Sequence, residues 1–189
     1  MKLYYAPGTC ALACWIALEW AGADYVAERV SYSSAEFKRI NPLAQVPALD
    51  IGWPRALTQA DAILQYVAAR HPEARLGPDE GIDAEAEFNE TLAFLTGDVH
   101  PAFWPFFAPQ RYTTLTDEAA LKGAKEASFA RVDRVMTYLD ALIGDRRHVY
   151  RDRRTIADPY AYVMAGWTRL YPKTFQAYPN LARFMAGMD

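Results

Sequence analysis

The sequence has few cysteines, no long apolar run and no dense run of basic residues. Its two cysteines, Cys10 and Cys14, are too few for a disulfide scaffold in a chain of 189 residues. No stretch approaches the roughly 20 consecutive apolar residues of a membrane-spanning helix. The net charge is only −3, and no lysine- or arginine-dense segment suggests a nucleic-acid-binding surface. These absences argue against the disulfide-rich, membrane-spanning and nucleic-acid-binding classes.

Signals for export and for metal binding are also missing. The N-terminal run MKLYY is broken at once by a Pro-Gly pair, so it is shorter than the apolar region of a secretory signal. We therefore expect a soluble, cytoplasmic protein. The three histidines, His71, His100 and His148, lack the spacing of a ligand set, and we expect no metal.

The two cysteines are four residues apart in a segment with helical periodicity. At that spacing in a helix, Cβ atoms lie roughly 5–6 Å apart, which exceeds the separation that a disulfide prefers. The pair does not form a CxxC motif either. We expect neither a disulfide nor a redox pair between Cys10 and Cys14.

The residues that are present favour a well-packed protein, since 52% are hydrophobic and 14% aromatic. In the first 70 or so residues, alternating and helical patterns succeed one another in the order β-α-β-α-β-β-α. The predicted strands are 3–5, 25–30, 46–51 and 56–58, and the predicted helices are 10–21, 34–40 and 61–70. This order predicts a compact α/β unit.

A segment rich in proline, glycine and charge, 71–81, follows this unit. We therefore predict a first domain over 1–72, a linker over 73–82 and an all-helical domain over 83–189. In the last part apolar residues recur at spacings of three and four, as on amphipathic helices. One stripe comprises Phe88, Leu92, Leu95, Val99, Phe103 and Phe106, and another comprises Leu121, Ala124, Ser128, Val132, Val135, Leu139 and Leu142.

Thr155 and Asp158 have the spacing of an N-terminal capping box. They predict the start of a further helix that continues through Met164 and Trp167. A last short helix is predicted over 180–185. We interpret Thr155 and Asp158 as structural.

Three segments, in this order, resemble the glutathione S-transferase family: KLYYAPGTCALA, NPLAQVPAL and TIAD. Together with His100 in the segment HPAF, Cys10 resembles the bacterial beta class, which carries a cysteine where other classes use tyrosine or serine. The resemblance covers essentially the whole chain. It implies an α/β plus all-α architecture: an N-terminal thioredoxin-like βαβαββα domain and a helical bundle, the glutathione transferase fold.

The resemblance also implies a glutathione-binding site. A cis peptide bond before Pro47 would turn the backbone of Val46 outward, to pair with the cysteinyl backbone of glutathione. Gln59 and Ala60 would hold the γ-glutamyl end at a helix N-terminus. Ala60 stands where the family usually has serine, and losing that hydroxyl costs about 1 kcal/mol, the value of one hydrogen bond.

Three residues are candidates for catalysis. Cys10 would face the sulfur of glutathione, and the free N–H groups at the start of its helix would lower its pKa; alternatively it is a small buried apolar residue. Tyr5, at a strand end, is either a core aromatic or a hydrogen-bond donor to the same sulfur. His100 is either a packing residue or a cleft residue that helps to deprotonate a thiol, although Pro101 stands where the beta class often has a basic residue.

The resulting hypothesis is a glutathione transferase, with glutathione as co-substrate and a homodimer as its assembly. It would either conjugate glutathione to small apolar electrophiles or perform thiol–disulfide or peroxide chemistry through Cys10, and a cysteine at this position favours the latter. An aromatic cluster, which includes Trp104 and Phe107, packs the helical bundle or lines a pocket for the second substrate. The alternative is a non-enzymatic, transferase-like module that binds a ligand or a protein.

Overall fold

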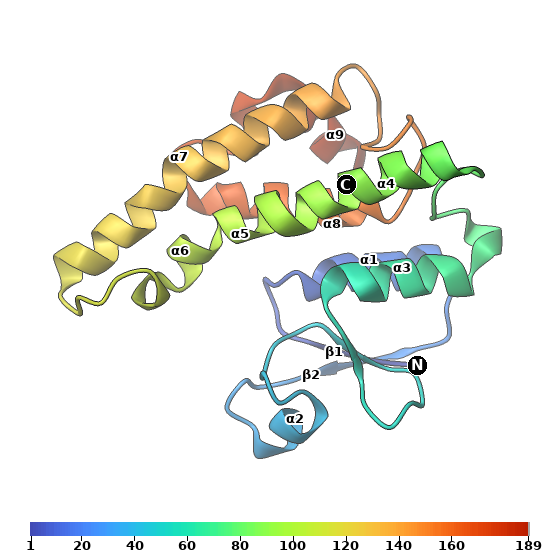
Figure 1. Cartoon of the computed structure of the whole chain (residues 1–189), viewed down its shortest axis with the longest axis horizontal. Helices are drawn as coiled ribbons and strands as arrows, with labels where there is room; N and C mark the ends of the chain where they lie inside the picture. The colour runs from blue at the N-terminus through green and yellow to red at the C-terminus, as the bar shows by residue number, and fades with distance from the viewer. Residues whose placement is uncertain (189) are drawn as a thin grey trace. The chain divides into compact units, whose positions relative to one another are not determined.

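A computed structural model describes residues 1–188 of the chain (Figure 1). By its contacts the chain divides into two units. The first comprises Met1–Glu85 and Arg154–Val163, and the second comprises Ala86–Arg153 and the chain from Met164 onward. The segment 154–163, which the sequence assigns to the helical domain, thus groups with the first unit. Among the helices of residues 1–188, none combines the length and the apolar character that crossing a membrane requires.

The first unit contains a four-stranded mixed sheet in the order β2-β1-β3-β4. β1 pairs with β2 in parallel and with β3 antiparallel, and β3 pairs antiparallel with β4. Figure 1 shows helices α1 and α3 on one face of this sheet and α2 on the other. The element order confirms the predicted βαβαββα unit. Its bounds are β1 Lys2–Tyr5, α1 Ala11–Trp20, β2 Val26–Arg29, α2 Ala35–Ile40, β3 Ala48–Asp50, β4 Leu57–Thr58 and α3 Ala60–Arg70.

Local signals at both ends fix the position of α1. Cys10 is its N-cap residue, with φ −61° and ψ −13°. At the other end, Gly22 takes a left-handed φ of 59°. Gly22 N–H donates to Glu19 and Ala23 N–H donates to Leu18, each at 3.0 Å. This pair of bonds is a Schellman motif, in which glycine meets the positive φ without a Cβ clash. The helix therefore starts at the first cysteine.

The predicted linker is ordered and partly buried. Pro72–Ala74 forms a 3-10 turn, and Leu76 is 1% exposed. The carbonyl of Leu76 accepts a hydrogen bond of 3.0 Å from the N–H of Ile156. The chain between the predicted domains is thus held by Ile156, which lies 80 residues after Leu76 in the sequence.

The remaining helices confirm the predicted all-α part. Proline accounts for a difference in the first apolar stripe, which was expected to follow one helix. Because Pro101 and Pro105 have no N–H to donate, the continuous helical ladder is interrupted, and a π-helical turn precedes Pro101. The segments are α4 Ile82–Phe94, the π turn Leu95–Val99, α5 His100–Ala102, α6 Trp104–Phe107, α7 Glu118–Ile143, α8 Ala157–Trp167 and α9 Pro179–Met188.

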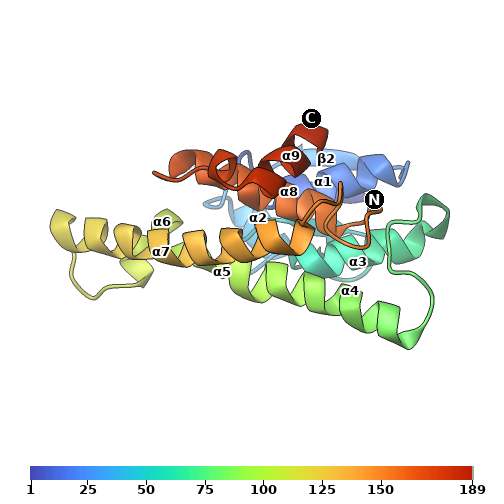
Figure 2. The same ribbon diagram turned by 90° about the horizontal axis from the view of Figure 1, so that it is seen from above.

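The long helix α7 packs against α6 and against α9 (Figure 2). Its buried face differs from the predicted stripe: Ser128, Val132 and Leu139 are buried as expected, but Met136 and Ile143 join them. Val135 and Leu142, which were expected on this face, are only partly buried. The buried positions recur every three or four residues, as one face of a helix requires.

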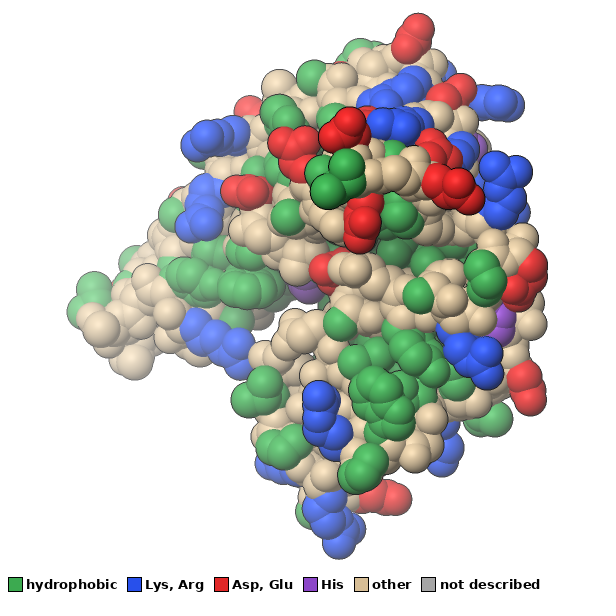
Figure 3. Space-filling view, turned by 45° about the vertical axis from the view of Figure 1, so that its right-hand side comes forward, with side chains coloured by type: hydrophobic (Ala, Val, Ile, Leu, Met, Phe, Trp, Pro, Cys, Tyr) green, Lys and Arg blue, Asp and Glu red, His purple; other side chains and the backbone are tan. Residues whose placement is uncertain are grey.

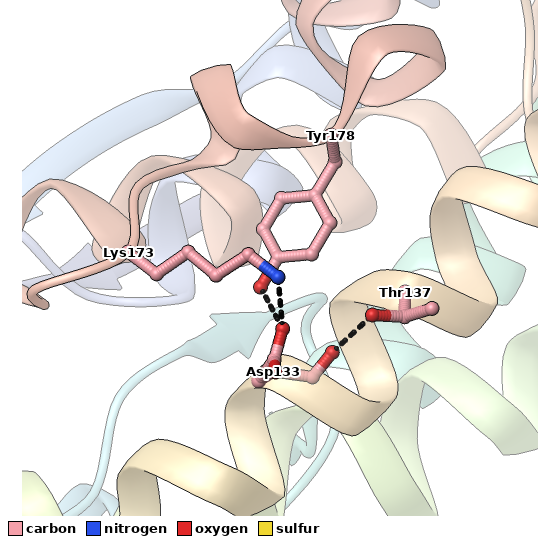
Figure 4. Close-up of polar contacts among 4 residues, drawn as sticks. All are labelled: Asp133, Thr137, Lys173 and Tyr178. Atoms are coloured by element: carbon pink, nitrogen blue, oxygen red, sulfur yellow. Dashed lines mark hydrogen bonds and ion pairs between the residues drawn. The ribbon is translucent and has the colours of Figure 1, made fainter.

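A polar cluster joins α7 to the chain that leads into α9 (Figure 4). The Asp133 carboxylate accepts hydrogen bonds from the Tyr178 hydroxyl at 2.8 Å and from the Lys173 ammonium. Thr137 Oγ1 donates to the main-chain carbonyl of Asp133 at 2.8 Å. The hydrogen bonds from Lys173 and Tyr178 lower the pKa of Asp133, because they stabilise its charged form. Asp133 thus links two parts of the second unit.

The capping box at the start of α8 is confirmed. The N–H of Thr155 donates to Asp158 Oδ2 at 2.7 Å, and Thr155 Oγ1 accepts from the N–H of Ala157 at 3.3 Å. Both Thr155 and Asp158 have 0% exposure. These polar side chains are therefore buried with their hydrogen bonds satisfied at a helix start, which fits the structural interpretation.

Candidate functional site

Cys10 lies at the start of α1, and 8% of the residue is exposed. Its thiol donates a hydrogen bond to the carbonyl oxygen of Val46, with 3.6 Å between Sγ and O. Burial raises the pKa of Cys10 to about 11, and a backbone hydrogen bond only partly opposes this. The expectation of a lowered pKa is therefore wrong for the free protein, because the cost of removing a thiolate from water exceeds the benefit of the helix terminus. At neutral pH Cys10 is a protonated hydrogen-bond donor.

The peptide bond between Val46 and Pro47 is cis, as the family resemblance implied. Val46 is 9% exposed, and its carbonyl is the acceptor for Cys10. The start of α1 and the turn before β3 are therefore in direct contact. This brings together two of the predicted site segments.

Asn41 organises the loop that leads to Val46. The residue is 5% exposed. Its Nδ2 donates to the carbonyl of Gln45 at 2.7 Å, and its Oδ1 accepts from the N–H of Leu43 at 3.2 Å. Between them, Ala44 takes a φ of 50°, a left-handed conformation that favours glycine. Asn41 was not among the predicted site residues, although an asparagine in a turn before a strand often hydrogen-bonds to the backbone that follows it.

Gln59 and Ala60 form the start of α3. Gln59 is the N-cap residue with φ 75°, and its side chain makes no cap hydrogen bond. The first helical hydrogen bond runs from the N–H of Ile63 to the carbonyl of Gln59. The side chain of Gln59 therefore leaves the first N–H groups of α3 uncapped, although Asp61 lies in the first turn. Uncapped N–H groups with a partial positive charge suit an anionic ligand group.

Cys14 contacts this second segment. It is fully buried, and its Sγ lies 3.6 Å from the carbonyl oxygen of Ala60. Burial holds the pKa of Cys14 well above its ordinary value, so it is a neutral donor. The two thiols of α1 thus donate to Val46 and Ala60, one from each segment predicted to hold glutathione. Cys14 was expected to be structural, but its contact with Ala60 was not predicted.

Tyr5 ends β1 and takes part in packing. Its ring lies edge-on to the ring of Trp15, with centroids 4.7 Å apart. Its carbonyl accepts a hydrogen bond of 2.9 Å from the N–H of Val30. Tyr5 also packs against the buried cluster that contains Tyr4 and Phe37. These contacts fit the core interpretation of Tyr5, and its catalytic role stays a prediction.

His100 belongs to the second unit, at the start of α5. Its ring lies 5.2 Å from that of Trp167 and 5.9 Å from that of Trp104, centroid to centroid. Burial lowers the pKa of His100 to about 4, because the apolar surroundings disfavour the imidazolium. His100 is therefore neutral at neutral pH, the form that can accept a proton. Its predicted action on a thiol stays a prediction.

The aromatic cluster predicted in the second unit exists as a network of ring contacts. Phe103 is fully buried and lies edge-on to Trp167 and Tyr171, with centroids 5.4 and 5.3 Å apart. Trp104 and Phe107 are 47% and 46% exposed. The inner rings are bundle core, and the outer rings leave aromatic surface free for contact with a ligand.

Two further observations concern ligand classes. Within residues 1–188, no group of three or more histidine, cysteine or carboxylate side chains is arranged to hold a metal ion. Figure 3 shows one face of the molecule, on which lysine and arginine side chains are interspersed with aspartate and glutamate. Hydrophobic side chains on the same face gather in patches.

Comparison with known proteins now defines the class. Residues 1–69 match the family model of the glutathione S-transferase N-terminal domain. The glutathione S-transferase GST-4.5 of Xanthomonas campestris is 35% identical over 88% of this chain and 82% of its own length. GstA of Escherichia coli O157:H7, also a glutathione S-transferase, is 28% identical over 100% of this chain and 92% of its own length.

Solved structures agree. The bacterial beta-class glutathione S-transferase of Sphingomonas chungbukensis has a TM-score of 0.87 at 32% identity, over 100% of this chain and 92% of that one. A sphingomonad glutathione S-transferase in complex with glutathione has a TM-score of 0.86 at 34% identity, with the same coverage. The chain belongs to the glutathione S-transferase family. Membership supports the transferase enzyme predicted from the sequence over the non-enzymatic module.

Proposed function

We propose that the chain binds glutathione in its first unit and conjugates it to small apolar electrophiles. The observation that carries the proposal is the pair of thiol contacts from α1. Cys10 bonds to Val46 and Cys14 bonds to Ala60, so that both segments expected to hold glutathione pack against the helix whose start carries Cys10. The relatives whose structures contain glutathione support the same co-substrate.

The protonation state of Cys10 favours conjugation. In that reaction the glutathione thiolate attacks the electrophile, and the site needs a donor that stabilises the thiolate. Because the pKa of Cys10 is about 11, its thiol keeps its proton at neutral pH. It can act as that donor once its S–H turns from the carbonyl of Val46 to the glutathione sulfur. The same pKa makes Cys10 a poor nucleophile, which reverses the preference for thiol–disulfide chemistry that the sequence suggested.

A thiol–disulfide activity remains the second candidate. Cys10 would lose its proton and attack one sulfur of oxidised glutathione, forming a mixed disulfide and releasing the other half as glutathione thiolate. The backbone hydrogen bond that lowers the pKa of Cys10 is the observation in its favour. Trp104 and Phe107 give the second unit exposed aromatic surface of the kind that binds apolar molecules.

The test uses immobilised glutathione, a chlorodinitrobenzene as electrophile, and intact-mass analysis after treatment with oxidised glutathione. We expect retention by the resin, conjugation, and conjugation preserved in Cys10→Ser but reduced about tenfold in Cys10→Ala, because serine keeps a donor. A glutathione-sized mass increase on Cys10 without conjugation would favour the second candidate. Absence of retention, conjugation and adduct together would refute both.

We further propose a homodimer that acts in detoxification in the cytoplasm of a bacterium, without a metal. The family resemblance motivates the dimer. Gel filtration at twice the chain mass of 21.3 kDa would support it, and elution at the single-chain mass would reject it.

A further inference from the structure

The hydrogen bond between Cys10 and Val46 occupies the thiol that the proposed reaction needs elsewhere. In the free chain the S–H of Cys10 donates to the carbonyl oxygen of Val46, with 3.6 Å between Sγ and O. A thiol has a single proton to donate, so Cys10 cannot donate fully to Val46 and to the sulfur of glutathione at the same time. A step that releases the thiol from Val46 must therefore accompany binding.

The acceptor in this bond is held from both sides. Before Val46, the carbonyl of Gln45 accepts a hydrogen bond of 2.7 Å from Nδ2 of the buried Asn41. After Val46, the chain enters β3, where Ala48 pairs with Tyr4 of β1. The carbonyl of Val46 therefore keeps its direction when its donor changes, and the thiol is the partner that moves.

Glutathione brings a stronger donor to the same carbonyl. Its cysteinyl amide nitrogen and its sulfur are attached to neighbouring carbon atoms, so a sulfur beside Cys10 places the amide N–H close to the acceptor of Cys10. An amide N–H is a better hydrogen-bond donor than a thiol, whose S–H is weak. Cys10 is 8% exposed and Val46 is 9% exposed, which leaves little room for two donors on one oxygen. The thiol is then the donor that leaves.

Cys14 makes a similar bond in a place that a ligand does not reach. Its Sγ also lies 3.6 Å from a main-chain carbonyl oxygen, that of Ala60. Cys14 is fully buried, whereas Cys10 keeps an exposed fraction. A ligand can therefore exchange with the thiol of Cys10 but not with that of Cys14, and Cys14 serves as an internal control on the same helix.

We propose that glutathione exchanges the donor on the carbonyl of Val46: its cysteinyl N–H replaces the Cys10 thiol, and the released S–H turns to the glutathione sulfur. The inference rests on the proposed function and deepens it, because binding of the co-substrate itself delivers the donor that stabilises the thiolate. No covalent bond forms or breaks in this step, and the proton stays on Cys10. In the free chain the same donor is occupied by Val46.

The first measurement is the infrared S–H stretching band of the full chain with S-methylglutathione, a ligand that has the cysteinyl amide but no S–H. The frequency of the band reports the strength of the hydrogen bond that the thiol donates. Cys10→Ala and Cys14→Ala each remove one band and so assign both. We expect the ligand to shift the Cys10 band to higher frequency, because a thioether is a weaker acceptor than a carbonyl oxygen. The Cys14 band should not change.

The second measurement identifies the new donor by nuclear magnetic resonance. With isotope labels on the amide nitrogen of the ligand and on the carbonyl carbons of the valines, we expect a scalar coupling across the hydrogen bond to Val46. Val46→Ile keeps the carbonyl but loses the label, so the coupling should disappear in that variant. Unchanged melting temperatures show that the variants are folded.

The outcomes separate this inference from the proposed function. A coupling without a shift of the Cys10 band means that one oxygen accepts both donors, and it refutes the exchange. A shift without the coupling means that another group releases the thiol, which refutes it equally. If the ligand binds and neither signal changes, the inference fails while the proposed function stands. If the chain binds neither immobilised glutathione nor S-methylglutathione, both fall.

Discussion

At the scale of single residues, Ala44 lies in the loop before Val46 at a position where glycine would fit the backbone better than alanine. Its φ of 50° is left-handed, where a Cβ atom is unfavourable. We predict that Ala44→Gly increases the free energy of unfolding by about 0.5–1 kcal/mol. Urea denaturation measures the change. The control is Ala141→Gly on the exposed side of α7, which should lose about 1 kcal/mol. A loss of stability in Ala44→Gly would contradict the prediction.

His100 gives the second residue-scale prediction. Its folded-state pKa of about 4 lies below its ordinary value of 6.5, so between these pH values the unfolded chain binds more protons than the folded one. The stability that His100 contributes is therefore fully present above pH 6.5 and is lost as the pH falls towards 4. We predict a fall of up to about 3 kcal/mol across this window.

Urea denaturation at a series of pH values measures this fall. The variant His100→Asn lacks the titrating group, so its stability should change less over the same window. Equal pH dependence in the two proteins would contradict a buried, neutral His100.

At the scale of elements, the start of α8 depends on a buried side-chain cap. Asp158 accepts from the N–H of Thr155 while fully buried, so its removal leaves a buried donor without its acceptor. We predict that Asp158→Ala lowers the free energy of unfolding by about 3 kcal/mol. Asp158→Asn, which keeps an acceptor oxygen, should lose less. Equal losses in the two variants, measured by urea denaturation, would show that the cap is not the cause.

The start of α9 depends on a carboxylate from another helix. Asp140, on α7, accepts from the N–H of Leu181 at 2.8 Å through Oδ1, and its Oδ2 accepts from Asn180 at 3.2 Å. We predict that Asp140→Ala costs about 1–2 kcal/mol, as for loss of a helix N-cap. The exposed Asp145 offers the control, since Asp145→Ala should change stability by less than about 0.5 kcal/mol. Thermal unfolding measures both.

Much of the fold could be predicted because its signals are local. Gly22, Ser34 and the Thr155 capping box end or begin helices through bonds within a few residues. The interruptions of the helix near Pro101 and Pro105 were not predicted, because the apolar residues keep their helical spacing across them. The pKa of Cys10 could not be predicted either, because burial by segments distant in sequence outweighs the helix start.

Part of the candidate site likewise could not be predicted from the sequence. Val46, Pro47, Gln59 and Ala60 were expected from motifs, and the cis bond is present. Cys14 was correctly placed inside the helix, but its contact with Ala60 joins residues 46 positions apart. Contacts of this kind depend on tertiary packing.

At the scale of the whole molecule, neither unit is one continuous stretch of chain. The first unit takes its last part from Arg154–Val163, where Ile156 bonds to Leu76. We predict that a fragment of residues 1–85 folds less cooperatively than the full chain, because it lacks this segment and the buried capping box. Circular dichroism during heating measures the transition. A fragment with the melting temperature of the full chain would contradict this prediction.

The bond from Ile156 to Leu76 also has a consequence for synthesis on the ribosome. The first 85 residues leave the exit tunnel well before residues 154–163 are made. Until then the carbonyl of Leu76 is without its partner, and the nascent sheet and its helices lack one segment of their unit. The first unit of this transferase therefore completes its folding only after most of the second unit has been translated.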